Sequence, residues 1–306
     1  MKLLGILLLI IVFFGSFLLG FGVRAKELGI KLYDIGDASS LPILTGTNSF
    51  PTVSGQGVIA VDATSNVTLY EKNADMQLYP ASTTKIITAL VSLDYYKHDQ
   101  VLTVFNPAVD GQKMGLVTGE QMTFLNMLNG LLIYSANDAA VTLADNYPGG
   151  REAFVNAMNA KVQDLHLDHS HFANPVGLDD STQFTTARDM VRVAEFAMRN
   201  PTFAGIVGTK EKIITDQTGK FSYDLSNVNQ LLGSVPGVIG VKTGFTEAAR
   251  ENLVTDVNRD NHDVFITILG SEDRFGETTE LINWIYGSYS WKSVTYAQKM
   301  VGMLLK

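Results

Sequence analysis

The chain has 306 residues, of which 46% are hydrophobic and 18% charged, as is typical of a globular protein with a substantial core. Its formal net charge of −8 argues against a nucleic-acid partner, because such a partner requires clustered lysine and arginine. The sequence contains no cysteine, so disulfides, thiolate metal sites and a cysteine nucleophile are excluded.

The first element is an uncharged N-terminal run from Leu3 to Val23. About 20 helical residues span the hydrocarbon core of a bilayer, whereas the apolar core of a signal peptide has about 7–15 residues. No clear small-x-small cleavage site precedes Glu27. We therefore expect residues 1–26 to be a signal anchor, with a cleaved signal peptide as the alternative. Either one directs the rest of the chain to the membrane or beyond it.

A lead-in and a β-hairpin follow. Residues 27–54 mix Gly, Ser, Thr, Pro and Asn without a lasting period, which predicts a linker. Val58–Asp62 and Val67–Tyr70 are short β-prone runs separated by a turn, which indicates a hairpin. Globular patterning begins at Gly55 and continues to about residue 290, with a short tail over 291–306.

The middle of the chain is predicted to be mainly helical. Pro80-Ala81-Ser82 is a helix start, followed by the apolar face of Ile86, Ile87 and Leu90. Further helical patterns cover Thr123–Ile133, Asp138–Asn146, Arg151–Leu165 and Thr186–Met198.

The last part returns to strands. The β-prone runs are Ile239–Lys242, Asn252–Val257 and Asp263–Leu269, and a helix is predicted over Glu277–Tyr286. Strands at both ends of a helical middle predict an α/β (α+β) fold, an antiparallel sheet covered by helices with an inserted, mainly helical subdomain.

Ser82-Thr83-Thr84-Lys85 is the first of three motifs that can carry chemistry. Residues three apart on a helix lie on the same face. A serine hydroxyl needs a neighbouring base to act as a nucleophile, and a desolvated lysine can lose its proton near neutral pH. Alone, the motif is also typical of a capped helix with a solvated lysine.

Two further motifs follow. Ser135-Ala136-Asn137 lies between two predicted helices, where a hydroxyl and an amide can relay a proton and hold a substrate amide, although alone it is typical of a helix N-cap. Lys242-Thr243-Gly244 ends a β-prone run. There a cation and a hydroxyl can clamp a carboxylate, and the glycine lets a substrate backbone approach. The three motifs in this order are a signature of serine acyl-transfer enzymes.

With these motifs the chain resembles the low-molecular-weight penicillin-binding proteins, which are serine-type D-Ala-D-Ala carboxypeptidases with a β-lactamase/transpeptidase-like fold. The resemblance extends over roughly Gly55 to Tyr289. It rests on Tyr79-Pro80-Ala81-Ser82-Thr83-Thr84-Lys85, Gly119-Glu120, Gly130-Leu131-Leu132, Ser135-Ala136-Asn137-Asp138-Ala139-Ala140, Asn174-Pro175 with Gly177-Leu178, and Val241-Lys242-Thr243-Gly244-Phe245-Thr246.

The resemblance implies a role for each motif residue. Ser82 would attack the carbonyl between two D-alanines and Lys85 would take its proton. Ser135 would pass a proton to the leaving D-alanine, and Asn137 would hold the substrate and the lysine. The substrate-binding residues would be Lys242 and Thr243 on the terminal carboxylate, together with Gly244 and Phe245, with the N–H groups of Ser82 and Phe245 forming the oxyanion hole.

The resemblance also sets the expected partners: wall peptides ending in D-Ala-D-Ala, β-lactam antibiotics as acylating inhibitors, and the membrane through the N-terminal segment. The catalytic domain, residues 55–290, would lie outside the cytoplasm. Little sequence follows Tyr289 to form the second, β-rich domain of many family members. No metal or cofactor is implied, and we interpret His166, His169 and His171 as loop residues rather than metal ligands.

Three alternative functions were considered, and one residue departs from the family's sequence pattern. The chain could instead be a D,D-endopeptidase on cross-links or a catalytically silent wall-binding module. A class A β-lactamase is disfavoured, because Ala153 to Ala194 contains no glutamate to activate a deacylating water. Arg250 stands where the family often has glycine, and we expect it to point to solvent, with an altered substrate preference as the alternative.

Overall fold

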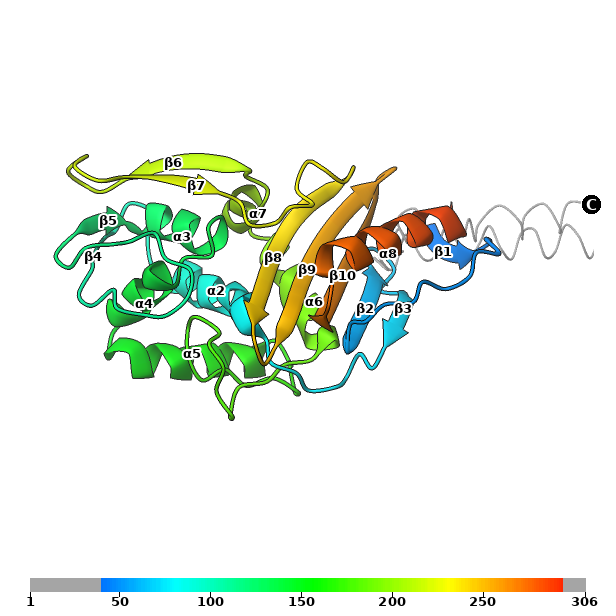
Figure 1. The fold of residues 1–306 in the computed structure, drawn as a ribbon, viewed down its shortest axis with the longest axis horizontal. Helices are drawn as coiled ribbons and strands as arrows, with labels where there is room; N and C mark the ends of the chain where they lie inside the picture. The colour runs from blue at the N-terminus through cyan, green and yellow to red at the C-terminus, as the bar shows by residue number, and fades with distance from the viewer. Residues whose placement is uncertain (1–39, 294–306) are drawn as a thin grey trace, which may run out of the picture. The chain divides into compact units, whose positions relative to one another are not determined.

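The computed structural model describes residues 40–293, and its centre is a five-stranded antiparallel sheet of order β3-β2-β10-β9-β8 (Figure 1). The strands are β2 (Gly57–Asp62), β3 (Thr68–Lys72), β8 (Val238–Thr246), β9 (Arg250–Arg259) and β10 (His262–Ser271). The predicted hairpin of β2 and β3 is present, and β9 and β10 form a second one. Their union through β2 and β10, with Val61 opposite Phe265, joins the two ends of the domain into one sheet. This arrangement leaves β8 at an edge of the sheet.

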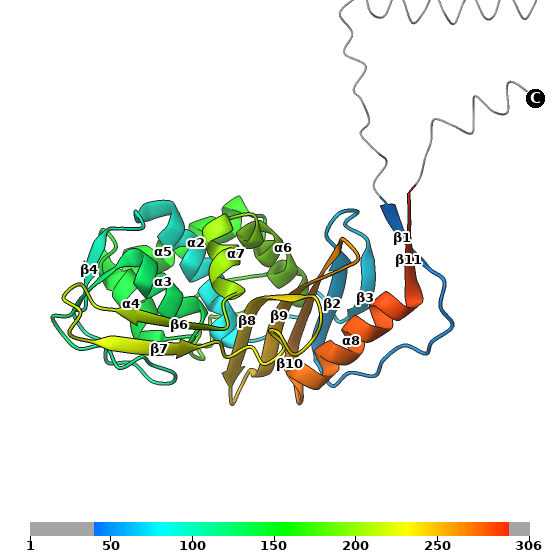
Figure 2. The same ribbon diagram turned by 90° about the horizontal axis from the view of Figure 1, so that it is seen from above.

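Helices cover both faces of the sheet (Figure 2). Side chains alternate along a strand, so Leu253 of β9 packs in the cluster of α8 (Arg274–Ser288), and Val254 in the cluster of α6 (Ala187–Met198). Behind α6 lies α2 (Lys85–Tyr95). This confirms the predicted fold class of an antiparallel sheet covered by helices.

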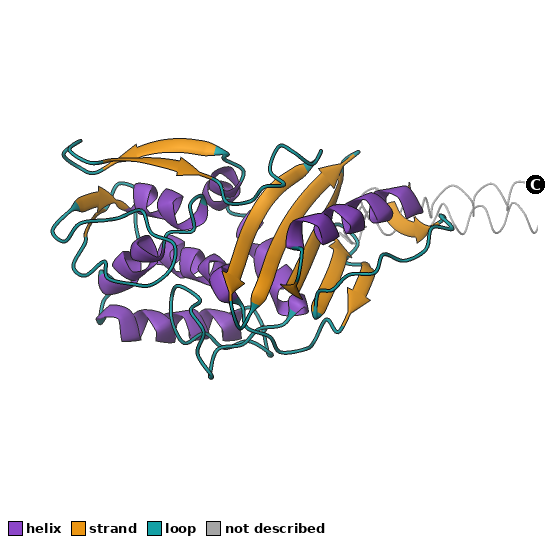
Figure 3. Cartoon of the chain, viewed as in Figure 1, coloured by secondary structure: helices purple, strands orange, loops and turns teal. Residues whose placement is uncertain are grey.

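The predicted helical subdomain is inserted between β3 and β8 (Figure 3). It contains α3 (Phe124–Leu132), α4 (Asn137–Asp145), α5 (Gly150–Asp164) and α7 (Pro201–Val207). All but α7 were predicted, within one or two residues at each end. Two small antiparallel pairs were not predicted: β4 (Val101–Thr103) with β5 (Gln121–Thr123) and β6 (Glu211–Thr215) with β7 (Ser222–Ser226). These strands have at most five residues and are largely exposed, so they carry no apolar alternation.

A two-stranded ribbon of β1 (Ser40–Leu44) and β11 (Tyr289–Ser293) stands beside α8 (Figure 2). Strand β1 lies inside the stretch for which the sequence predicted a linker. The predicted anchor over residues 1–26 and nearly all of the predicted tail lie outside the described residues. Within residues 40–293, no helix combines the length and apolar character needed to cross a membrane.

The predicted helix start at Ser82 is a short 3₁₀ helix, η1 (Ala81–Thr84), that leads directly into α2. The chain before it is tied to the sheet by Asn252, a fully buried residue of β9. Its Nδ2 donates to Tyr79 O at 2.9 Å, and its Oδ1 accepts from Gly270 N at 2.8 Å. One side chain therefore joins β9, β10 and the segment that precedes η1.

Replacing Asn252 by alanine leaves two buried backbone groups without partners. Each such group costs about 1–3 kcal/mol, so we expect Asn252→Ala to lower the free energy of unfolding by about 2–4 kcal/mol in urea titrations. Asn283→Ala, at an exposed position of α8, is the control and should stay within about 0.5 kcal/mol of the parent. Equal stability of the two variants would contradict a structural role for Asn252.

Candidate active site

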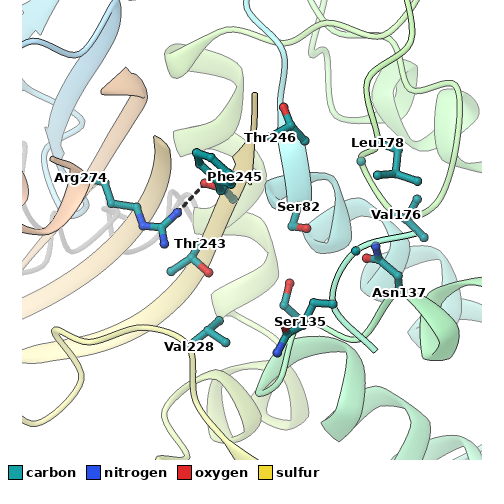
Figure 4. Close-up of a pocket in the computed structure, with 14 residues that line it drawn as sticks. Ser82, Ser135, Asn137, Val176, Leu178, Val228, Thr243, Phe245, Thr246 and Arg274 are labelled. Atoms are coloured by element: carbon teal, nitrogen blue, oxygen red, sulfur yellow. Dashed lines mark hydrogen bonds between the residues drawn. The ribbon is translucent and has the colours of Figure 1, made fainter. Parts of the chain in front are cut away.

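A pocket of about 290 Å³ lies between the edge strand β8, the 3₁₀ helix η1 and the loop between α3 and α4 (Figure 4). Ser82 lies near its centre, with Ser135 and Asn137 on one side and Thr243 and Arg274 on the other. All predicted site residues line it except Lys85 and Lys242, which lie beneath its surface. The lining residues are Ser82, Gly111, Gln112, Ser135, Asn137, Val176, Gly177, Leu178, Val228, Thr243, Gly244, Phe245, Thr246 and Arg274.

Lys85 is fully buried, and its amine contacts the hydroxyl of Ser82. Lys85 Nζ donates to Ser82 Oγ at 2.7 Å and to Val176 O at 2.9 Å. Burial lowers the pKa of Lys85 well below its usual value, and the nearby charge of Lys242 lowers this pKa further, while Asp138 opposes the shift. The structure thus holds a readily deprotonated amine against a serine hydroxyl.

The carbonyl that holds Lys85 belongs to a tight loop over residues 174–178. Asn174 Oδ1 accepts from the backbone N–H groups of Val176, Gly177 and Leu178 at 2.7–3.2 Å. Gly177 has a φ of +87°, and a Cβ there would lie 1.8 Å from Ala81 O. Only glycine lets this loop approach η1 closely enough for Val176 O to reach Lys85.

A second buried lysine lies on β8. Lys242 Nζ donates to Ser135 Oγ at 2.8 Å and to Thr243 O at 3.0 Å. Burial, with a further contribution from the charge of Arg274, lowers the pKa of Lys242 to about 7. This contact joins the second and third motifs across the pocket.

Arg274 lines the pocket but was not singled out from the sequence. It opens α8, its guanidinium donates to Gly244 O at 2.7 Å, and its Nε is buried without a hydrogen-bond partner in the described residues. A guanidinium with an unused donor beside Thr243 is suited to a carboxylate ligand. An isolated arginine at a helix start has no local pattern that distinguishes it from a surface residue.

Asn137 opens α4 and is buried at the pocket wall. Its Nδ2 donates to Asp110 O at 2.5 Å, while its Oδ1 has no partner within the described residues. The hydrogen bonds of Lys85 go to Ser82 and Val176, so Asn137 does not hold the lysine in this structure. Its neighbour Asp138 was not singled out as a site residue.

Asp138 fixes the loop that supplies Gly111 and Gln112 to the pocket. Its buried carboxylate accepts from the N–H groups of three successive residues, Met114 to Leu116, at 2.8–3.1 Å. Asn137 N also donates to Gln112 O at 2.7 Å. The start of α4 therefore orders the wall opposite β8.

Two residues of the site, Ala81 and Ser135, adopt the left-handed backbone conformation. Ala81, which precedes the first serine, has a φ of +48°, and Ser135 has a φ of +61°. Left-handed conformations are disfavoured for residues with a Cβ and are concentrated at functional sites. Gly244 packs directly on this turn, because a Cβ there would lie 3.0 Å from Ser82 N. Phe245, the next residue of β8, is 60% exposed at the pocket rim.

Arg250 lies outside the pocket. Its guanidinium pairs with Glu272 and its side chain is 38% exposed, as expected for a residue that points to solvent. Its φ of +58° lies in the left-handed region, which explains why glycine suits this position.

Known proteins resemble this chain over most of the described residues. A family model described as peptidase S11, D-alanyl-D-alanine carboxypeptidase, matches residues 45–273. D-alanyl-D-alanine carboxypeptidase DacF of Bacillus subtilis is 32% identical over 244 residues, which are 76% of this chain and 62% of that protein. The chain thus spans less than two thirds of that relative.

Two further comparisons cover more of the relative. A D-alanyl-D-alanine endopeptidase of Pseudomonas aeruginosa is 33% identical over 240 residues, 76% of this chain and 77% of that protein. The crystal structure of the Streptomyces K15 DD-transpeptidase superposes with a TM-score of 0.74 at 31% identity, covering 78% of this chain and all of that one. Since the family model and these relatives agree, the chain belongs to the peptidase S11 family, the D-alanyl-D-alanine carboxypeptidases.

Proposed function

We propose that the protein is a serine-type D-Ala-D-Ala carboxypeptidase that removes the terminal D-alanine from peptidoglycan stem peptides through an acyl-enzyme on Ser82. The observation that carries this proposal is the 2.7 Å contact between Ser82 Oγ and the buried amine of Lys85. A silent wall-binding module has no need of a desolvated lysine, because burying an unpaired cation is costly.

In the first step Ser82 Oγ attacks the carbonyl carbon of the penultimate D-alanine while neutral Lys85 takes the hydroxyl proton. The negative charge that develops on the carbonyl oxygen is held by the backbone N–H groups of Ser82 and Phe245. The packing of Gly244 on Ser82 N supports this role, because it brings β8 against the turn that carries the nucleophile.

The terminal carboxylate of the substrate lies at the other end of the pocket, against Thr243 and Arg274. Lys242 adds a charge from below, and the three groups together select a peptide with a free C-terminus. Ser135, held by Lys242 at 2.8 Å, passes a proton to the nitrogen of the leaving D-alanine and takes the proton that Lys85 removed from Ser82, which returns Lys85 to its neutral form. Water then attacks the ester on Ser82, with Lys85 as the base, and releases the shortened peptide.

The same acyl-enzyme chemistry accounts for two neighbouring activities. A β-lactam ring presents a strained amide and a carboxylate to the same groups, so it acylates Ser82 as well. A D,D-endopeptidase on cross-links is the second candidate, and it is favoured by the similarity to the endopeptidase of Pseudomonas aeruginosa. The two activities differ in the amine that leaves, which is the terminal D-alanine in a carboxypeptidase and the cross-linked stem peptide in an endopeptidase.

The proposed substrate places the catalytic domain outside the cytoplasm, where the wall peptides are. The uncharged run from Leu3 to Val23 supports attachment to the cell membrane, because its length matches the hydrocarbon core. We include this attachment in the proposal, with the catalytic domain over residues 55–290.

Ser82→Ala removes the proposed nucleophile and should reduce D-alanine release from a peptide ending in D-Ala-D-Ala on the order of a thousandfold or more. The measurement is free D-alanine after incubation with the full-length chain. Ser222→Ala, at an exposed position of β7, is the matched control and should retain parental activity. Release that continues in Ser82→Ala would reject the proposed nucleophile.

The two buried lysines predict a bell-shaped dependence of kcat/KM on pH. Lys85 must be neutral to act as a base, so activity rises with pH through its lowered pKa. Lys242 must be charged to bind a carboxylate, so activity falls above its pKa of about 7. Arg274→Gln removes a charge that lowers this pKa, so the falling limb should move to higher pH, although the maximum rate also falls.

Rates of D-alanine release across the neutral and alkaline range measure this shift. Arg250→Gln is the control, because that arginine lies outside the pocket and pairs with Glu272. Its falling limb should coincide with that of the parent. If kcat/KM falls over the same pH range in the parent and in both variants, the deprotonation of Lys242 does not cause that fall.

A further inference from the structure

A second pocket, of about 390 Å³, lies beside the first. It is formed by the turn between β8 and β9, by the segment leading to η1 and by the loop before α6, which meet at the lower end of β8 and β9 in Figure 1. The lining residues are Gln56, Gln77, Leu78, Tyr79, Ser181, Gln183, Phe184, Ala248 and Ala249. None of the proposed catalytic steps uses it.

A single bridge separates the two pockets. Thr246 Oγ1 donates to Asp179 Oδ1 at 2.7 Å and accepts from Ala249 N at 2.9 Å. Thr246 lines the first pocket and Ala249 the second. The second pocket therefore begins where the catalytic cleft ends along β8.

The direction of the bound peptide follows from the proposed function. The terminal carboxylate lies at Thr243 and the reacting carbonyl at Phe245, so the acyl part of the substrate continues past Thr246. Because β8 is an edge strand, an extended peptide can run along it. Strand β8 ends at Thr246, one residue beyond Phe245, and Ala248 lies in the turn that follows, so a peptide paired with β8 reaches the second pocket about two residues beyond the reacting carbonyl. The second pocket thus receives a group two or three residues upstream of the cleaved bond.

The chemistry of the pocket selects the kind of group. Its lining contains no charged side chain. The side-chain amide of Gln183 already has hydrogen-bond partners within the protein, since it donates to Leu178 O at 3.0 Å and accepts from Ala173 N at 3.2 Å. The side chains of Gln56, Gln77 and Ser181 form no hydrogen bond within the part of the chain that the structure describes, so they can bind a ligand. An amide side chain both donates and accepts, which matches another amide.

A carboxylate is a poor match for this pocket. No cation lines it within residues 40–293, and Arg250, which follows Ala249 at the end of the β8–β9 turn, already pairs with Glu272. Moving a charged group out of water into a site that offers no partner is strongly unfavourable. We propose that the second pocket is a subsite for an uncharged carboxamide on the stem peptide, one or two residues upstream of D-Ala-D-Ala. This inference rests on the proposed function for the direction of the peptide.

Three synthetic peptides ending in D-Ala-D-Ala test the subsite with the full-length chain. The first carries a carboxamide two residues upstream of D-Ala-D-Ala, the second carries a carboxylate there, and the third is truncated before that residue. We expect kcat/KM to favour the carboxamide peptide over the carboxylate peptide about five- to tenfold, as one or two hydrogen bonds imply. Equal rates for these two peptides would overturn the subsite.

Gln77→Lys places a cation in the pocket at an exposed position and should reverse the preference, while the truncated peptide changes by less than about twofold. Gln163→Lys, at an exposed position of α5, is the matched control and should keep the parental preference. A reversal in the control as well would mean that long-range charge, and not the pocket, sets the preference, and would also overturn the inference.

Cleavage itself separates this inference from the proposed function. If the parent cleaves none of the three peptides, the proposed carboxypeptidase activity fails, whatever the subsite does. The subsite is then tested by calorimetric binding of the two longer peptides to Ser82→Ala, which requires no turnover. Tighter binding of the carboxamide peptide supports the subsite, and equal binding overturns it.

Discussion

The site depends on one constraint, which is that the amine of Lys85 is buried and forms no hydrogen bond to a carboxylate within residues 40–293. Its two hydrogen-bond partners are a hydroxyl and a backbone carbonyl, and both are uncharged. Removing an ammonium group from water favours the neutral amine, and here burial and the charge of Lys242 outweigh the opposing charge of Asp138. A neutral amine 2.7 Å from Ser82 Oγ is the general base that a serine nucleophile requires. The surrounding elements hold the amine of Lys85 next to Ser82.

Three parts of the fold converge on this contact. Helix α2 supplies Lys85 one turn beyond the serine, the loop over residues 174–178 supplies the carbonyl, and β8 closes the site through Gly244. The glycines act at points of close approach, where a Cβ on Gly177 or Gly244 would push the loop or the strand away from η1. The sheet in turn holds the turn before η1 through Asn252. Catalytic geometry and core packing are therefore coupled.

Local features of the site could be predicted from the sequence, and long-range ones could not. Ser82 and Lys85 are three residues apart on a helical pattern, so their contact follows from helix geometry alone. The contact between Ser135 and Lys242 joins residues 107 apart, and only the known motif signature indicated that they meet. Arg274 and the carbonyl of Val176 gave no signal, because their importance lies entirely in what folding brings beside them.

The fold shows the same division. Strand β10 was predictable because most of its buried residues form a nearly continuous apolar run, and α6 because its apolar residues recur at helical spacing. The ribbon of β1 and β11 pairs residues from opposite ends of the described chain, and nothing in either strand indicates its partner. The hairpin of β6 and β7 is mostly exposed, so its hydrogen bonds leave little trace in the sequence.

The most direct test of the central claim is to locate the covalent bond. The full-length chain is incubated with a β-lactam, digested, and analysed by mass spectrometry for the mass of the opened ring. The account predicts a single modified site at Ser82, and slower modification of a Lys85→Gln variant in which the serine is retained. Modification at another residue, or an unchanged rate in Lys85→Gln, would contradict the assignment of Ser82 and Lys85 as nucleophile and base.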